Sequence, residues 1–168
     1  MLNINKKEIN LLIVSFARSE DQWELSLEER EKIIRLNYDK EIKFNLATEA
    51  KFVSQLKKAD SVYLRGGNCY LITNILKKYS DLKDLFDGKI IAGSSAGVDV
   101  LAKYYYDNDY DAIEKGLGVL PIKAICHYGK GNTYGKDFYP KLQKLKNYNE
   151  DLETVALKET EFIIREVR

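Results

Sequence analysis

Residues 93–97, with the sequence Gly-Ser-Ser-Ala-Gly, place Ser95 at the centre of a short turn between small residues. The segment fits the pattern G-x-S-x-G, in which a strand leads into the turn and a helix leaves it. Residues 89–92 (Lys-Ile-Ile-Ala) supply the strand-like run before it. Such a turn exposes the serine hydroxyl, and the following helix favours negative charge at its N-terminus. Ser95 is therefore a candidate nucleophile, and the N–H of Ala96 is a candidate oxyanion donor.

A serine nucleophile needs a general base, because its free hydroxyl reacts slowly. His127 is the only histidine in the chain, so histidine-dependent chemistry must use it. An imidazole base in turn needs an acid that fixes its tautomer. The candidates between Ser95 and His127 are Asp107, Asp109 and Asp111. Three acids this close together are by default typical of a solvated surface loop, and one of them would be the third member if the triad exists.

A second glycine-rich turn, residues 65–68 (Arg-Gly-Gly-Asn), follows another apolar run. A glycine pair at the end of a parallel strand lets backbone N–H groups point into the crevice where open α/β sheets bind ligands. Gly66, Gly67 and Asn68 are therefore candidates for oxyanion and substrate binding. The ordinary alternative is a structural turn. The segment is not a phosphate loop, because it contains neither G-x-x-x-x-G-K nor G-x-G-x-x-G.

The elements that position these turns follow from the apolar pattern. Near-continuous apolar runs predict buried strands at residues 9–16, 60–64 and 89–92. Helical patterns lie between them, one opened by a capping box at Ser26 and Glu29. This alternation predicts an α/β fold with a mostly parallel sheet. The expected later elements are a helix from the Ser95 turn to about residue 104, an irregular excursion at 104–114, a strand at 124–126, a helix at 138–147, and strands at 153–157 and 161–167 that could form a hairpin.

Composition narrows the function classes. A chain of 168 residues is enough for one compact domain. Its net charge of +1 argues against duplex DNA or an anionic membrane as a partner. Two cysteines are too few for a disulfide framework or a four-cysteine zinc site. The apolar run near the start is too short to span a bilayer, and no signal peptide is evident. These features predict a cytoplasmic protein without a membrane or nucleic-acid partner.

In order and spacing, three segments resemble peptidase family S51, which includes dipeptidase E and cyanophycinase. Residues 65–72 are similar to the G-G-N segment of the family, and residues 93–97 to its serine turn. Residues 118–128 are similar to the segment that ends at its catalytic histidine. The resemblance covers residues 9–128. It implies a three-layer, mostly parallel flavodoxin-like sheet with helices on both faces, as in the class I glutamine amidotransferases.

The resemblance also implies a function. Ser95 would be the nucleophile and His127 the base of a Ser-His-Asp triad that cleaves a small peptide or related amide through an acyl-enzyme, with no metal or organic cofactor. Because Asn108-Asp109 is similar to an Asn-Asp pair in dipeptidase E, Asp109 is the predicted acid. The chain would be a single domain over 1–168, shortened at both ends, with a homodimer as one way to cover the exposed sheet edge.

One departure from the family concerns specificity. Dipeptidase E carries an arginine after the histidine that recognises aspartate, and residues 128–147 contain no arginine. The cations nearest to that position are Lys130, Lys136 and Lys141. Lysine does not reproduce a bidentate guanidinium, so α-aspartyl specificity is not predicted. Two alternatives stay open: a catalytically inactive amidotransferase-like protein that binds a small molecule, and a short esterase of the α/β-hydrolase type.

Overall fold

The computed structural model describes residues 7–37, 41–129 and 138–166. Its contacts divide the chain into two compact units, residues 1–97 and 98–168, and each is described by itself. That 1–168 forms a single domain stays a prediction. In the ranges described, no helix is long and apolar enough to cross a membrane.

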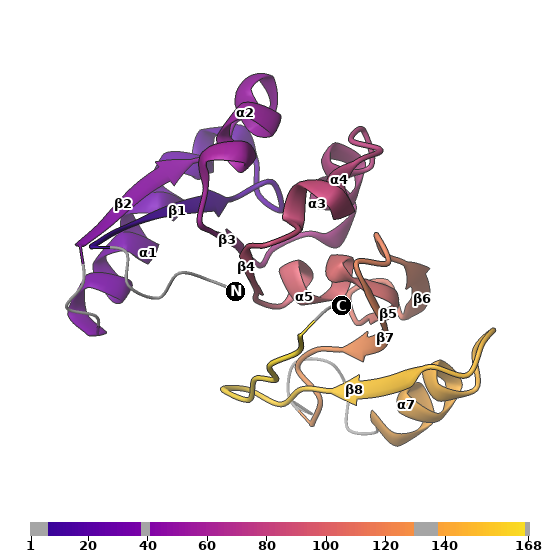
Figure 1. Cartoon of the computed structure of the whole chain (residues 1–168). Helices are drawn as coiled ribbons and strands as arrows, with labels where there is room; N and C mark the ends of the chain where they lie inside the picture. The colour runs from indigo at the N-terminus through magenta and orange to yellow at the C-terminus, as the bar shows by residue number, and fades with distance from the viewer. Residues whose placement is uncertain (1–6, 38–40, 130–137, 167–168) are drawn as a thin grey trace. The chain divides into compact units, whose positions relative to one another are not determined.

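The first unit is built on a parallel sheet with the strand order β2-β1-β3-β4 (Figure 1). Its strands are β1 (Glu8–Val14), β2 (Glu41–Leu46), β3 (Ser61–Leu64) and β4 (Ile90–Gly93). Its helices are η1 (Glu20–Gln22), α1 (Trp23–Asn37), η2 (Glu49–Lys51), α2 (Phe52–Lys58), α3 (Cys69–Leu76) and α4 (Leu82–Phe86), and α5 (Ala96–Leu101) begins at its end. The three strands predicted from apolar runs are confirmed.

The core of this unit lies against β1. Leu12, Ile13 and Val14 are buried completely or almost so. The ring of Phe16 lies 5.1 Å from Trp23 and 5.3 Å from Phe52, centroid to centroid. These aromatic contacts tie the first residues of α1 and α2 to the carboxyl end of β1, where the loops of a parallel sheet form ligand sites.

The capping box predicted at Ser26 is wrong. Helix α1 begins at Trp23, preceded by the short helix η1. Ser26 is buried in the first turn of α1, where its hydroxyl accepts a 2.9 Å hydrogen bond from the hydroxyl of Ser15. A tertiary contact therefore uses the side chain that the local pattern assigned to a helix cap.

The second unit has the strand order β6-β5-β7-β8. Its strands are β5 (Ala102–Asp107), β6 (Ala112–Lys115), β7 (Leu120–Ile125) and β8 (Glu153–Ala156). The β5–β6 pair is antiparallel, whereas β7 pairs in parallel with both β5 and β8. The predicted helix at 138–147 is confirmed as α7 (Phe138–Lys146). Together the two units confirm the predicted α/β class with mostly parallel pairing.

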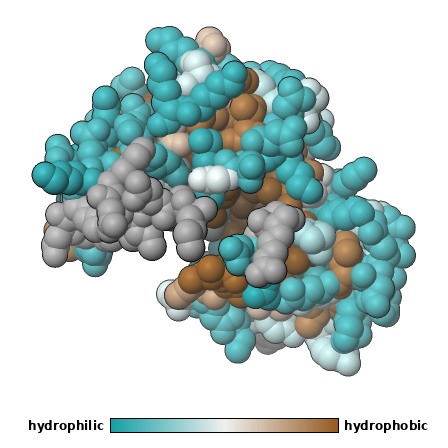
Figure 2. Space-filling view, in the orientation of Figure 1, coloured by the Kyte–Doolittle hydropathy of each residue, from teal (hydrophilic) through white to brown (hydrophobic). Residues whose placement is uncertain are grey.

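Three expectations for this unit are wrong. Helix α5 ends at Leu101, and residues 104–114 form the β5–β6 hairpin, because the run of tyrosines at 104–106 favours a buried strand. Strand β8 pairs with β7 and makes no hairpin with residues 161–166, which form no strand. Phe162 and Ile164 in that segment are 79% and 81% exposed, and Figure 2 shows hydrophobic side chains along the chain after β8.

Candidate active site

Ser95 lies in the turn between β4 and α5 with a backbone φ of +50°. A positive φ is uncommon in a residue with a side chain and costs on the order of 1–3 kcal/mol, so surrounding structure must hold it. The N–H of Ser94 donates to the carbonyl of Leu64, at 3.1 Å, and the N–H of Gly97 donates to the carbonyl of Ser94, at 2.9 Å. These bonds fix the turn at the carboxyl ends of β3 and β4.

Two glycines let neighbouring backbone approach this turn. A Cβ added to Gly97 would lie 2.2 Å from the carbonyl oxygen of Leu64, which no real side chain tolerates. A Cβ added to Gly66 would lie 3.0 Å from the Cβ of Ser95 and 3.0 Å from the carbonyl oxygen of Ser94. The loop after β3 therefore packs directly on the Ser95 turn, and this contact lies wholly within the first unit.

The backbone amides of that loop are mostly engaged. Hydrogen bonds join the Arg65 amide to the Val14 carbonyl, the Gly66 amide to the Ser94 hydroxyl and the Asn68 amide to the Ala17 carbonyl. The Gly67 N–H makes no hydrogen bond within the described residues. Ala96 opens α5, and the first N–H groups of a helix have no partner inside the helix. Gly67 and Ala96 thus supply two amides that remain for a ligand.

Asn68 has a structural function that the sequence pattern did not indicate. It is the N-cap of α3, and its side-chain oxygen accepts hydrogen bonds from the N–H groups of Tyr70, at 2.8 Å, and Leu71, at 3.1 Å. This arrangement satisfies two of the helix's otherwise unpaired donors. The Asn68 oxygen is therefore committed to positioning α3.

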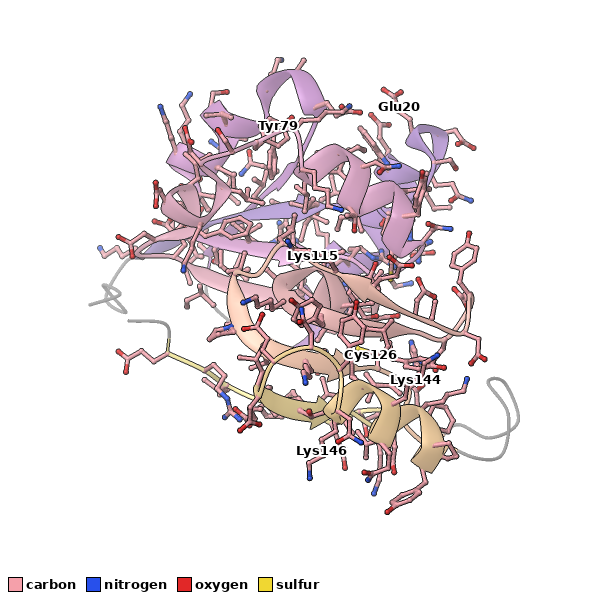
Figure 3. The ribbon with its side chains drawn as sticks, turned by 90° about the vertical axis from the view of Figure 1, so that its right-hand side faces the viewer. Glu20, Tyr79, Lys115, Cys126, Lys144 and Lys146 are labelled. Carbon is pink, nitrogen blue, oxygen red and sulfur yellow. The ribbon has the colours of Figure 1, made fainter. Side chains whose placement is uncertain are left out.

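His127 lies just after β7 with a φ of +58°, next to Cys126, which is labelled in Figure 3. Its Nδ1 atom is 2.5 Å from a carboxylate oxygen of Glu159. The parallel pairing of β7 with β8 continues past both strands, because the Leu157 amide donates to the Ile125 carbonyl and the Tyr128 amide to the Leu157 carbonyl. This continuation brings the two side chains together.

Two of the three candidate aspartates have structural partners. The carboxylate of Asp107 is buried and accepts a 2.9 Å hydrogen bond from the amide of Asp109. Asp111 pairs with Lys141 at 2.9 Å and accepts a hydrogen bond from the Tyr106 hydroxyl. The Lys141 hydrogen bond and then the Tyr106 hydrogen bond lower the pKa of Asp111. Lys141, one of the three lysines considered for substrate recognition, is therefore held by Asp111; Lys130 and Lys136 lie outside the described residues.

The third aspartate, Asp109, is exposed and makes no hydrogen bond to His127 in the part of the chain described. Its neighbour Asn108 ties the loop to the same strand end, because the Asn108 amide nitrogen donates to the carbonyl of Cys126, at 2.9 Å. Within the described residues, a different acid, Glu159, is in contact with His127, and the sequence reasoning missed it. No local motif marks Glu159, and only the β7–β8 pairing indicates it.

Each unit thus presents one set of chemical groups. The first holds a strained serine beside two available amides, and the second holds a histidine hydrogen-bonded to a carboxylate. Such groups serve acyl transfer, in which a serine attacks, an imidazole moves the proton and amides bind the oxyanion. Among the residues described, no three His, Cys, Asp or Glu side chains gather as metal ligands would.

Comparison with known proteins identifies the family of this chain and shows solved structures with a similar fold. The model of peptidase family S51 matches residues 4–166. A putative peptidase E from Listeria monocytogenes EGD-e is similar in structure, with a TM-score of 0.64 and 16% identity over 94% of this chain and 81% of that one. A peptidase from an acI-B1 Actinobacterium gives 0.65 and 23% identity over 89% of this chain and 67% of that one. No curated protein matches the sequence.

The two solved structures share the fold, and the family match covers almost the whole sequence, including both glycine-rich turns and His127. The chain therefore belongs to peptidase family S51 and is a peptidase.

Proposed function

We propose that the protein is a serine-type peptidase that cleaves a short peptide or a related amide through an acyl-enzyme. Ser95 attacks the carbonyl carbon while His127 accepts the hydroxyl proton, and His127 then gives that proton to the leaving amine as the C–N bond breaks. Water, activated by His127, hydrolyses the ester and restores Ser95. The observation that carries the proposal is the position of Ser95, held at a φ of +50° between a strand and a helix.

Glu159 is the proposed orienting acid. Its contact with Nδ1 of His127 leaves Nε2 as the ring nitrogen that exchanges the proton with serine. The carboxylate also stabilises the imidazolium that forms during attack. The sequence-based choice, Asp109, makes no comparable contact within the described residues, so we assign this function to Glu159.

The proposed oxyanion donors are the amides of Ala96 and Gly67. Ala96 directly follows the nucleophile and opens α5, where the helix dipole favours negative charge. Gly67 belongs to the loop whose Gly66 backbone packs against Ser95. Gly66 itself is a weaker candidate, since its N–H already donates to the Ser94 hydroxyl at 3.2 Å.

A fluorophosphonate probe tests the proposal directly, because it labels an activated serine. The wild-type protein should be labelled, and Ser95→Ala should lose the label and about 10⁶-fold in kcat if the groups act as a unit. Ser94→Ala is the matched control, since it removes the neighbouring hydroxyl and should still be labelled. Labelling that persists in Ser95→Ala would exclude Ser95 as the nucleophile.

Hydrolysis of a dipeptide library, followed as release of free amine, would then define the substrate. The library should include N-terminal acidic residues together with neutral ones of the same size. A folded wild-type protein that neither takes the label nor releases amine from any dipeptide would overturn the enzymatic proposal and favour the non-catalytic binding protein considered above.

A further inference from the structure

Three arginines gather near the carboxyl end of the parallel sheet in the first unit. Arg18 follows β1, Arg65 follows β3 directly, and Arg30 lies on α1. The Arg30 guanidinium carbon lies 5.0 Å from the centre of the Tyr63 ring. Burial lowers the pKa of Arg65, and the positive charges of Arg18 and Arg30 lower it further, so both groups are close enough to Arg65 to repel it.

Their hydrogen-bonding capacity is not used up. The Nε atoms of all three arginines are buried and have no partner among the residues described. Arg65 donates to the carbonyl of Ser26, at 2.5 Å, and to the half-exposed carboxylate of Glu29, at 3.3 Å. The side chains of Arg18 and Arg30 have no carboxylate partner in the described ranges. A buried donor left unpaired is energetically costly, so an anion that accepts hydrogen bonds here would be stabilised.

The cluster lies beside the Ser95 turn. Tyr63, whose ring is next to Arg30, donates a 2.9 Å hydrogen bond from its hydroxyl to that of Ser94. Arg65 directly precedes Gly66, whose amide donates to the same Ser94 hydroxyl. Tyr63 and Arg65 are two residues apart on one extended segment and so lie on the same face of the sheet. All these contacts belong to the first unit.

We propose that Arg18, Arg30 and Arg65 form a carboxylate-binding site that holds the substrate's carboxylate beside Ser94. This inference rests on the proposed function. Guanidinium groups match carboxylates through paired, charge-assisted hydrogen bonds, and three of them with one partly exposed acid leave an excess of positive charge. The carboxylate can come from the C-terminus of a short peptide or from an acidic side chain, and the two sources are separable by experiment.

Calorimetric binding to the Ser95→Ala protein measures recognition without turnover. The probes are two matched pairs: alanyl-alanine with its C-terminal amide, and glutamyl-alanine amide with glutaminyl-alanine amide. In at least one pair, the carboxylate member should bind about tenfold more tightly or better, which corresponds to about 1.4 kcal/mol. Preference in the first pair assigns the terminal carboxylate, and preference in the second assigns the side chain. Equal binding within both pairs, or no binding of any peptide at millimolar concentration, would overturn the proposal.

Variants made in the Ser95→Ala protein connect any preference to the cluster. Arg30→Gln and Arg18→Gln should each abolish most of the preference for the carboxylate peptide. Arg30→Lys should retain only part of this preference, because lysine lacks the planar fork of a guanidinium. Arg35→Gln is the control: Arg35 lies on the same helix and pairs with Glu31 at 2.7 Å. Thermal unfolding checks that each variant folds, and Arg65 is left unchanged because it is buried. A preference for the carboxylate peptide that survives in both glutamine variants would exclude the site. Because all binding is measured in the Ser95→Ala protein, the preference and its loss can both be tested whether or not Ser95 is catalytic.

Discussion

The Nδ1 atom of His127 lies 2.5 Å from a carboxylate oxygen of Glu159, 32 residues further along the chain. The pair forms where β7 and β8, two parallel neighbours, both end. His127 is one-quarter exposed and Glu159 half exposed, so the pair lies at the surface of its unit. A carboxylate that fixes one ring nitrogen determines which nitrogen is available for proton transfer.

Replacing this carboxylate should impair chemistry more than binding. Glu159→Gln keeps the size of the side chain but removes the charge that stabilises an imidazolium. We expect kcat on a cleaved dipeptide to fall by on the order of 10²–10⁴-fold, with a much smaller change in KM. Steady-state kinetics of the two variants Glu159→Gln and Asp109→Asn make the comparison, and Asp109→Asn should leave kcat within a few-fold of wild type.

The opposite outcome is equally informative. If Asp109→Asn lost activity while Glu159→Gln kept it, the sequence-based choice of Asp109 would be right and the His127–Glu159 contact would be structural. Glu161→Gln is a suitable control, because Glu161 is a nearby exposed acid that accepts a hydrogen bond from the Lys158 amide and makes none to His127.

Much of the first unit could be predicted from sequence. Its strands are apolar runs, and its turns contain glycines because neighbouring backbone approaches too closely for a side chain. The run at residues 11–14 is almost entirely buried, as expected for a strand covered on both faces. Gly97 flanks Ser95 because no larger residue fits against the Leu64 carbonyl. Local patterns identified these features because the strand and the turn are local structures.

The missed features depend on contacts between distant segments. Ser26 resembles a helix cap, but its hydroxyl is used by Ser15, which follows β1. The segment 104–114 reads as polar because of its aspartates, yet it forms a hairpin in which Tyr104, Tyr105 and Tyr106 are buried. Glu159 becomes a candidate only once β8 is known to pair with β7 in parallel. None of these facts follows from spacing along the chain.

The ion pair of Lys103 and Glu150 predicts a pH dependence of stability in the second unit. The Lys103 ammonium lies 2.7 Å from the Glu150 carboxylate, which also accepts a hydrogen bond from the Tyr104 hydroxyl. The bond from Lys103 is the main cause that holds the pKa of Glu150 below its ordinary value of 4.5. A carboxyl whose pKa is lower when folded stabilises the protein above its unfolded pKa, and this stabilisation is lost as pH falls through the folded pKa.

Urea unfolding of wild type and Glu150→Gln from pH 7 to pH 3 tests this prediction. Wild type should be the more stable at pH 7, and the difference in unfolding free energy should shrink below pH 4.5. Asp151→Asn, which removes a charge from the next, exposed position, should show no comparable dependence. A difference between wild type and Glu150→Gln that stayed constant across the range would show that the ion pair is not the cause.

Variants of Asn68 test whether this residue of the second glycine-rich turn stabilises the fold or binds the substrate. Its side-chain oxygen caps α3, so Asn68→Ala should lower the free energy of unfolding by about 1 kcal/mol. Asn68→Ser also caps helices well and should keep both stability and kcat/KM near wild type. Denaturant unfolding and steady-state kinetics of the two variants distinguish the cases. A serine variant with wild-type stability but a raised KM would instead assign the Asn68 amide to the substrate, because the cap would be intact while binding was lost.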